Sequence, residues 1–307
     1  MTDDPFIKDF NPVVGRAEEL CPGLRRLVAP NASAMTFRGT NTYILGETEI
    51  AVIDPGPDSS EHLAAILAAV GDAHRISHVF VTHSHVDHSP LARRLAQAAN
   101  APVLAFGDSH AGRSPRMAAL AAGFDLGGGE GVDMDFAPDI LLADGEATVA
   151  REWRLQAITT PGHFSNHLCF AWNDKVFSGD HVMSWATTLV SPPDGDLTAS
   201  MRSLDRMAAR AGDRVYYPGH GAVLENPQAM IRYQINHRRM RESQILEALT
   251  DGAATARQLA ERIYTEIPPE LIPAAARNVF SHLIDLSERK VAEPIGTLSP
   301  DARFHLL

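Results

Sequence analysis

The segment VTHSHVDHSP, residues 81–90, places three histidines and an aspartate within six positions, directly after an apolar run. The chain has 14 histidines in 307 residues, so a cluster of this density seldom arises by chance. The preceding run ISHVFVTH has the length and β-branching of a buried strand, and Pro90 opens a helical pattern. Imidazoles and carboxylates are ligands of Zn²⁺ and similar divalent ions. The segment therefore predicts a metal-binding loop between a strand and a helix, with a plain polar loop as the alternative.

The order of residues within this loop favours two metal ions. His83 and His85 are two positions apart at a strand end, so their side chains can point to the same side. Asp87 and His88 are adjacent where the chain turns toward the helix, so their side chains diverge. This divergence suits two neighbouring ions better than one.

Three further candidate ligands follow later strand-like runs. His163 comes after Pro-Gly in TTPGHFSNH, Asp180 follows a glycine in FSGDH, and His220 lies between glycines in YYPGHG. The neighbouring glycines permit tight turns and close approach of the backbone. Any one of them alone would be an ordinary loop residue, but the recurrence of strand, glycine and ligand predicts a shared site.

The order of predicted elements favours sheets covered by helices. A β-hairpin is expected at 41–56, and a glycine-rich loop region with a short helix at 107–136. Helices are expected at 59–72, 90–100 and 196–211, and strands at 76–83, 101–106, within 139–183 and in RVYYPGH. The last 80 residues differ: three helical patterns and a two-stranded hairpin, turning near Ser299 and Pro300, are typical of a winged helix-turn-helix.

Composition limits the classes of partner. The net charge is −11, which disfavours non-specific attraction to phosphate backbones. Residues 228–307 carry ten basic and ten acidic residues, so the winged-helix segment is neutral where DNA-reading modules are usually basic. A structural or lid role is therefore favoured for this segment, and contact with nucleic acid is the alternative.

The remaining bulk features point to a soluble, cytoplasmic protein. The two cysteines form no C-x-x-C pattern, so neither a disulfide framework nor a thiolate zinc site is expected. The first residues lack the pattern of a secretory signal, and no apolar run approaches the roughly 20 residues that span a bilayer. Small apolar patches in the last 80 residues make a homodimer plausible.

The pattern H-x-H-x-D-H, followed in order by His163, Asp180 and His220, resembles the metallo-β-lactamase superfamily. The resemblance covers roughly residues 25–225 and implies a four-layer αβ/βα sandwich, with catalytic residues in 1–227 and a winged-helix-like domain in 228–307. It implies that one zinc is held by His83, His85 and His163, a second by Asp87, His88 and His220, and that Asp180 bridges both. Asp54 in VIDPG matches an early aspartate motif, which implies that it orients the ligand loop.

The C-terminal segment refines this resemblance. GTNTYILG, PGHGAVLENP and INHRRMRESQIL are similar to a β-lactamase-like subgroup with a C-terminal winged helix. That subgroup includes a mitochondrial endoribonuclease and many uncharacterised bacterial hydrolases. A metal-dependent endoribonuclease, with RNA as partner, is therefore the alternative to a hydrolase of a small molecule.

The predicted activity is hydrolysis of a small ester-like substrate, a thioester or a lactone, by a hydroxide shared between two Zn²⁺ ions. Iron or manganese could replace zinc, and a mononuclear iron oxygenase acting on persulfides is a less favoured alternative. Asp87 is expected to orient the hydroxide as well as to bind metal, and His167 either to donate to the substrate or to support the ligands. His181 is expected to point away from the site. Trp185 either lines the substrate or simply packs.

Overall fold

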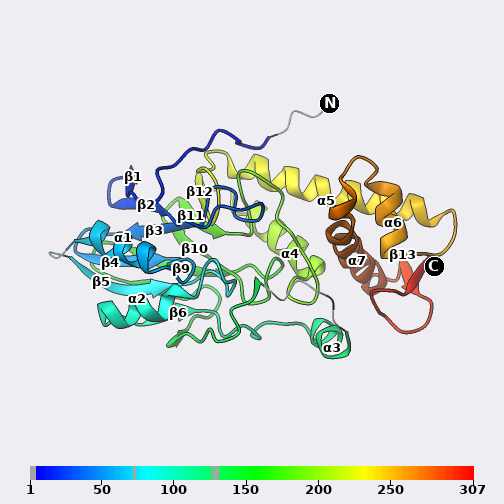
Figure 1. The fold of residues 1–307 in the computed structure, drawn as a ribbon, viewed down its shortest axis with the longest axis horizontal. Coiled ribbons are helices and arrows are strands. Elements are labelled where there is room, and N and C mark those ends of the chain that lie inside the picture. Colours follow the sequence, from blue (N-terminus) through cyan, green and yellow to red (C-terminus); the bar gives the residue numbers. More distant parts are fainter. Residues whose placement is uncertain (1–4, 72–73, 125, 127–130) are drawn as a thin grey trace.

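The computed structural model describes residues 5–71, 74–124, 126 and 131–307. Two β-sheets face each other at its centre (Figure 1). The first sheet runs in chain order: β1 (Glu18–Cys21), β2 (Leu24–Val28), β3 (Asn41–Leu45), β4 (Glu49–Ile53), β5 (Arg75–Phe80), β6 (Val103–Ala105) and β7 (Ile140–Leu141). Strands β1–β4 pair antiparallel and β4–β7 pair parallel.

The second sheet is mostly antiparallel. Its order is β12 (Val215–Pro218), β11 (Lys175–Gly179), β10 (Leu168–Trp172), β9 (Arg154–Thr159) and β8 (Ala147–Val149), and only β11 and β12 pair parallel. The inner faces of the two sheets share one apolar core, to which the first sheet contributes Tyr43 and Phe80 and the second contributes Phe170 and Phe177. Burial of these aromatic rings is the main force that holds the sheets together.

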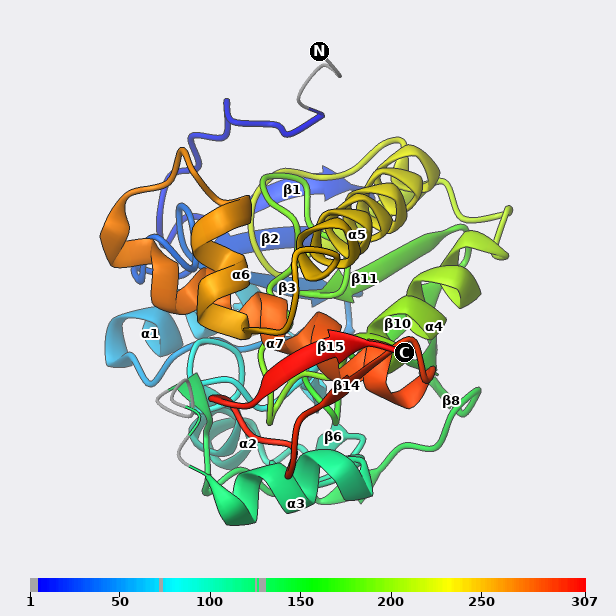
Figure 2. The same ribbon diagram turned by 90° about the vertical axis from the view of Figure 1, so that its right-hand side faces the viewer.

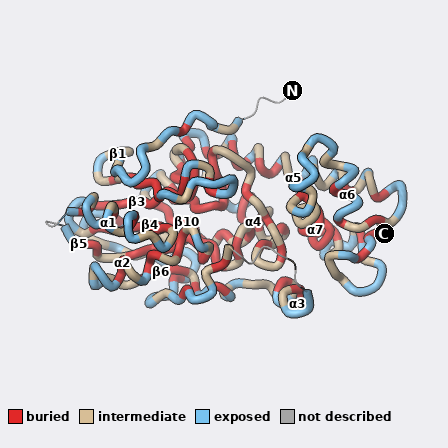
Figure 3. The backbone as a smooth tube through the Cα atoms, viewed as in Figure 1, coloured by how far each residue is buried: buried red, intermediate tan, exposed pale blue. Residues whose placement is uncertain are grey.

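Helices cover both outer faces and complete four layers (Figures 1 and 3). α1 (Ser60–Val70) and α2 (Leu91–Ala99) pack on the first sheet, and α4 (Leu197–Ala208) and the start of α5 (Pro227–Leu249) pack on the second. Side chains that the sequence places at the helix starts cap them: Ser59 accepts from the amide of His62, and Asp196 accepts from that of Ala199. The four-layer αβ/βα sandwich predicted from the sequence is confirmed.

The C-terminal region is a winged helix, as predicted (Figure 2). It contains α6 (Ala256–Ile263), a 3₁₀ turn (Pro269–Leu271), α7 (Ile272–Glu288) and the strands β13 (Ala254–Thr255), β14 (Ala292–Pro294) and β15 (Arg303–Leu306). The capping box formed by Thr255 and Gln258 fixes the start of α6. The wing sheet has the strand order β13-β15-β14. The sequence predicted only a two-stranded hairpin, because β13 has two residues and is too short to show a strand pattern.

Two elements connect the winged helix to the sandwich. Met230 and Ile231 at the start of α5 lie in the core beneath the second sheet, whereas Ile245 and Leu249 at its end lie in the core of the winged helix. Helix α3 (Pro115–Gly123) also contributes Met117 and Leu120 to the winged-helix core. The domain boundary expected between residues 227 and 228 stays a prediction. It falls in the first turn of α5, which contributes side chains to both cores.

None of the helices in the described ranges is long and apolar enough to cross a membrane.

Candidate metal centre

The seven predicted ligands meet at one edge of the sandwich, from four segments that each follow a strand. The segment after β5 supplies four of them, and the segments after β9, β11 and β12 supply the others: His83, His85, Asp87, His88, His163, Asp180 and His220. The structure thus brings together every candidate ligand, although His83 and His220 are 137 positions apart in the sequence.

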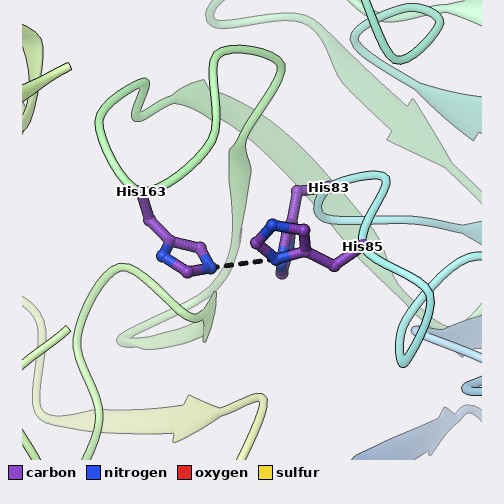
Figure 4. A group of neighbouring side chains, drawn as sticks. All are labelled: His83, His85 and His163. Atoms are coloured by element: carbon purple, nitrogen blue, oxygen red, sulfur yellow. Dashed lines mark hydrogen bonds between the residues drawn. The ribbon is translucent and has the colours of Figure 1, made fainter. Parts of the chain in front are cut away.

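The first group consists of three imidazoles (Figure 4). Nε2 of His83 lies 2.9 Å from Nδ1 of His85, which lies 3.1 Å from Nε2 of His163. Figure 4 shows the three rings turned toward one another, His83 and His85 from one loop and His163 from another. Burial, followed by the neighbouring histidines, lowers the pKa of His85 to about 3, so this ring is neutral at pH 7. Three imidazoles facing a common point are a typical zinc-binding arrangement.

The second group combines two imidazoles with a carboxylate. Nε2 of His220 lies 3.2 Å from Nε2 of His88 and 3.1 Å from Oδ2 of Asp87. Asp180 lies between the two groups: its carboxylate oxygens are 3.4 Å from Nε2 of His220, 3.5 Å from Nε2 of His88 and 3.7 Å from Nε2 of His163. Asp180 therefore has the position of a carboxylate that could contact ions in both groups.

Acceptors behind the rings fix which nitrogen faces the centre. Nδ1 of His163 lies 2.7 Å from the carbonyl of Leu189, and Nδ1 of His220 lies 3.2 Å from the carbonyl of Gly39. A carbonyl can only accept, so each Nδ1 carries a proton, which leaves Nε2 as the nitrogen that could bind a metal ion. Outer contacts of this kind orient histidine ligands in metal sites.

Asp54 orders the loop after β5. Its carboxylate accepts hydrogen bonds from the backbone amide of Thr82 at 2.7 Å and from the Thr82 hydroxyl at 2.8 Å, and it lies 3.0 Å from Nδ1 of His88. Because the Thr82 hydroxyl donates to Asp54, its oxygen is left to accept from Nδ1 of His83 at 3.0 Å. One carboxylate thus orients the rings of two candidate ligands. Asp54 has φ 51°, a left-handed conformation that aspartate tolerates better than most residues.

The charges of the second group favour a cation. Burial by itself would raise the pKa of Asp180, but the facing His220 and His88 rings hold it well below the usual range. Burial would likewise lower the pKa of His220, but Asp180 and Asp87 raise it to about 9. Buried, ionised carboxylates next to imidazole nitrogens attract positive charge, and a divalent ion supplies it. The donor set therefore fits divalent metal ions, with the harder oxygen ligands in the second group.

His167 lies behind the cluster and supports it. Its Nδ1 is 2.8 Å from the hydroxyl of Thr160, and its Nε2 accepts from the backbone amide of Asp180 at 3.2 Å. Burial and the neighbouring His181 hold its pKa well below the usual range, so the ring stays neutral. Both nitrogens are engaged, and the ring is 1% exposed. The geometry favours support of Asp180 over donation to a substrate.

His181 and Trp185 flank the cluster. His181 is buried, its ring centroid lies 6.2 Å from that of His167, and burial lowers its pKa to about 4. Trp185 is half-buried and stacks on Phe37, with ring centroids 5.0 Å apart and an interplanar angle of 7°. A Cβ added to Gly221, next to His220, would lie 3.0 Å from Cδ1 of Trp185, so this ring lies close to the backbone there. The two aromatic rings therefore lie beside the second group of ligands.

Sequence reasoning missed Phe37, although two signals bear on it. It precedes Arg38 and Gly39 in a loop between two strands, and it adopts φ 56°, which is unusual for an aromatic residue. The sequence also gave no sign of the carbonyls of Gly39 and Leu189, because a backbone acceptor has no side-chain signature.

Gly219 offers a test of how tightly the ligands are held. A Cβ at this position would lie 2.6 Å from Cε1 of His88 and closer still to Oδ1 of Asp180. We therefore expect Gly219→Ala to displace both side chains, and a displacement of about 1 Å costs about 10²-fold in rate. Metal content by elemental analysis and kcat/KM would measure the effect. Gly212→Ala is the control, because a Cβ there meets no atom within 4 Å; equal behaviour of the two variants would contradict the packing described.

Comparison with known proteins agrees with this geometry. Residues 35–220 match the model of the metallo-beta-lactamase superfamily, and residues 255–297 match that of the beta-lactamase associated winged helix domain. The chain belongs to the metallo-β-lactamase superfamily and is a hydrolase of that family.

Two relatives are similar to this chain over most of its length. An atrochrysone carboxyl ACP thioesterase of Aspergillus fumigatus is 31% identical over 280 residues, which cover 85% of this chain and 79% of the relative. A beta-lactamase-like protein 2 homolog of Drosophila melanogaster is 32% identical over 275 residues, covering 86% and 87%. Among solved structures, a beta-lactamase domain protein from Burkholderia ambifaria has the same fold, with a TM-score of 0.80, 20% identity and coverage of 97% and 96%.

Proposed function

We propose that this protein is a thioesterase that depends on two divalent metal ions, with zinc as the metal. One zinc would be held by His83, His85 and His163, and the other by Asp87, His88 and His220, with Asp180 between them. The observation that carries the proposal is the pair of adjacent donor groups joined by Asp180. The thioesterase name of the fungal relative supports a thioester over a lactone as substrate.

The proposed chemistry needs no serine or cysteine nucleophile. Two divalent ions at these positions would supply Lewis acidity, which acidifies water at neutral pH and stabilises negative charge on a carbonyl oxygen. Asp87 is 21% exposed at its side chain, the most open carboxylate of the cluster, so it can accept a hydrogen bond from the attacking water and orient it. Its pKa lies below the usual range because His88 and His220 outweigh the opposing effect of burial.

The other residues have positioning roles in this proposal. His167 fixes the backbone of Asp180 by accepting from its amide. Asp54 sets the orientation of His83 and His88 through Thr82 and its own carboxylate. Trp185 and Phe37 form an apolar wall beside His220, which suits the acyl group of a small substrate. Contact with RNA and a homodimer stay predictions.

The experiment that tests the function combines metal analysis with substrate choice. The protein purified without added metal is analysed for metals, and activity is measured on a thioester, a lactone and a labelled RNA. About two zinc ions per chain, with preferred turnover of the thioester, would support the proposal. One iron per chain with oxygen uptake on a persulfide, or preferred cleavage of RNA, would overturn it. His220→Ala should lose metal and activity, whereas His305→Ala, which replaces a half-exposed histidine of β15, should keep both.

A further inference from the structure

A second polar cluster lies between α5 and α7, beside α6 (Figures 1 and 2). Arg238 on α5 donates through Nη1 to Oδ1 of Asn278 on α7 at 2.7 Å, and Nδ2 of Asn278 donates to the hydroxyl of Tyr264 at 2.9 Å. The guanidinium of Arg241 lies 4.2 Å from the centre of the Tyr264 ring. We call this the α5–α7 cluster; its members are Gln234, His237, Arg238, Arg241, Tyr264, Asn278 and His282.

Several buried nitrogens of the α5–α7 cluster make no hydrogen bond to any described residue. They are Nε2 of Gln234, Nδ1 of His237, Nε of Arg241 and both ring nitrogens of His282. Gln234 is 3% exposed and His282 is 1% exposed. An unsatisfied buried polar group costs about 1–3 kcal/mol, so native proteins seldom leave several together without a partner. Nε2 of Gln234 and Nε of Arg241 always carry a proton. Burial lowers the pKa of His282 to about 3, so its neutral ring donates from one nitrogen and can accept at the other. The unpartnered set therefore contains at least three donors, which indicates a partner that accepts.

The cluster is also positively charged, which favours a partner that carries negative charge. Within the described chain, Arg238 and Arg241 form no ion pair with a carboxylate. The nearby carboxylates Glu242 and Asp285 are engaged by Arg289, at 2.6 Å and 2.9 Å. Burial, followed by the charges of Arg238 and Arg241, lowers the pKa of His237 to about 4. Uncompensated positive charge surrounded by free donors is the typical environment of a bound oxyanion.

The α5–α7 cluster also adjoins the metal centre. Arg238 donates through Nη2 to the carbonyl of Thr188, and the Thr188 hydroxyl donates to the carbonyl of Asp180 at 2.7 Å. The next carbonyl along, that of Leu189, is the one bound by His163. One short segment therefore contacts the candidate metal ligands on one side and the cationic cluster on the other.

We propose that the α5–α7 cluster binds the phosphoryl group of a phosphopantetheine thiol carrier whose acyl thioester reaches the metal centre. The inference rests on the proposed thioesterase function and adds the class of its substrate. A phosphate offers several acceptor oxygens and negative charge, which match the free donors of Gln234 and His282 and the guanidinium of Arg241. The carrier is either free, as in coenzyme A, or attached to a carrier protein, since both contain the same phosphopantetheine phosphate.

The kinetic test compares carriers that differ only in the phosphate. Wild-type protein and Arg241→Gln are assayed on S-acyl phosphopantetheine and on S-acyl pantetheine. We expect Arg241→Gln to raise KM for S-acyl phosphopantetheine by about 10-fold, because the variant loses one hydrogen bond to a charged group. KM for S-acyl pantetheine should stay unchanged. The matched control is Arg257→Gln, which removes an exposed arginine of α6 that pairs with Glu261. Parallel assays on acyl-coenzyme A and on an acylated carrier protein identify the source of the phosphate.

A binding measurement makes the test independent of activity. Inorganic phosphate is titrated into metal-free wild-type protein and Arg241→Gln by calorimetry, and we expect about 10-fold weaker binding to the variant. Equal KM for the two pantetheine substrates, or equal phosphate binding by both proteins, would overturn the proposal. Loss of phosphate binding only in Arg238→Met would also contradict it, because Arg241 would then take no part.

The two proposals fail in different ways. If no thioester is hydrolysed but Arg241-dependent phosphate binding remains, the thioesterase function and its carrier are wrong, and the anion site stands. If RNA is cleaved instead and Arg241→Gln weakens that cleavage, the phosphate belongs to a nucleic acid and the carrier is wrong.

Discussion

Replacing Asp180 with alanine is expected to deplete bound metal and to lower kcat/KM by at least about 10³-fold, the upper range for loss of one electrostatic group in an active site. Its carboxylate lies within 3.7 Å of imidazole nitrogens in both ligand groups, so its removal affects both at once. It also leaves His220 with Asp87 as its neighbouring carboxylate and His88 with Asp87 and Asp54. Metal analysis and thioester kinetics on the same preparation measure the two effects.

The control for this variant is Asp58→Ala, which removes an exposed aspartate that pairs with Arg94 on the surface. Exposed pairs contribute about 0–1 kcal/mol, so metal content and rate should stay near those of the wild type. Retention of two metals per chain by Asp180→Ala would show that this carboxylate does not join the two groups.

Leu283→Ala is expected to destabilise the protein by about 3 kcal/mol, since this side chain on α7 is fully buried in the winged-helix core and its truncation leaves a cavity. Unfolding in urea, followed by circular dichroism and tryptophan fluorescence, gives the change in free energy. Because α3 and α5 contribute to that core, we expect both signals to shift together in a single transition.

Leu271→Ala provides the matched control, because the same truncation at a 49% exposed leucine removes little buried surface. Its expected cost is below about 1 kcal/mol. Two separate transitions in Leu283→Ala, with the tryptophan signal unchanged, would mean that the winged helix unfolds independently and that the shared helices do not couple the cores.

The sandwich could be predicted because its strands are short apolar runs between clear turn and capping signals. β1 and β2 were not predicted, and the reason is physical. β2 reads LRRLV, and its Arg26 is buried even though it is charged, because it forms a 2.6 Å ion pair with Glu18 and stacks on Phe10 at 4.7 Å. Partners from elsewhere in the chain decide the burial of such a residue, and a local pattern cannot show them.

The candidate ligands could be predicted because each follows a strand and has a chemically distinctive side chain. Their supports were only partly visible. Asp54 lies in a recognisable segment, whereas Thr82 and the carbonyl of Leu189 fix the rings of His83 and His163 with groups found throughout any sequence. The α5–α7 cluster was hidden for a related reason. Its arginines belong to a segment whose net charge is zero, and only the fold separates them from the acidic residues that Arg289 engages.

The continuity of α5 restricts how substrates can enter. Many enzymes with two structural units open by rotation about a flexible connection between them. Here the connection is a 23-residue helix with its first turns fixed beneath the second sheet and its last turns fixed in the winged helix. Rotation would break backbone hydrogen bonds in the middle of that helix, so we expect any opening of the metal centre to come from local movement of loops, such as the one that carries Phe37. For the proposed thioesterase, we would then expect the Phe37 loop to select the acyl group by size and shape, while the winged helix stays in place.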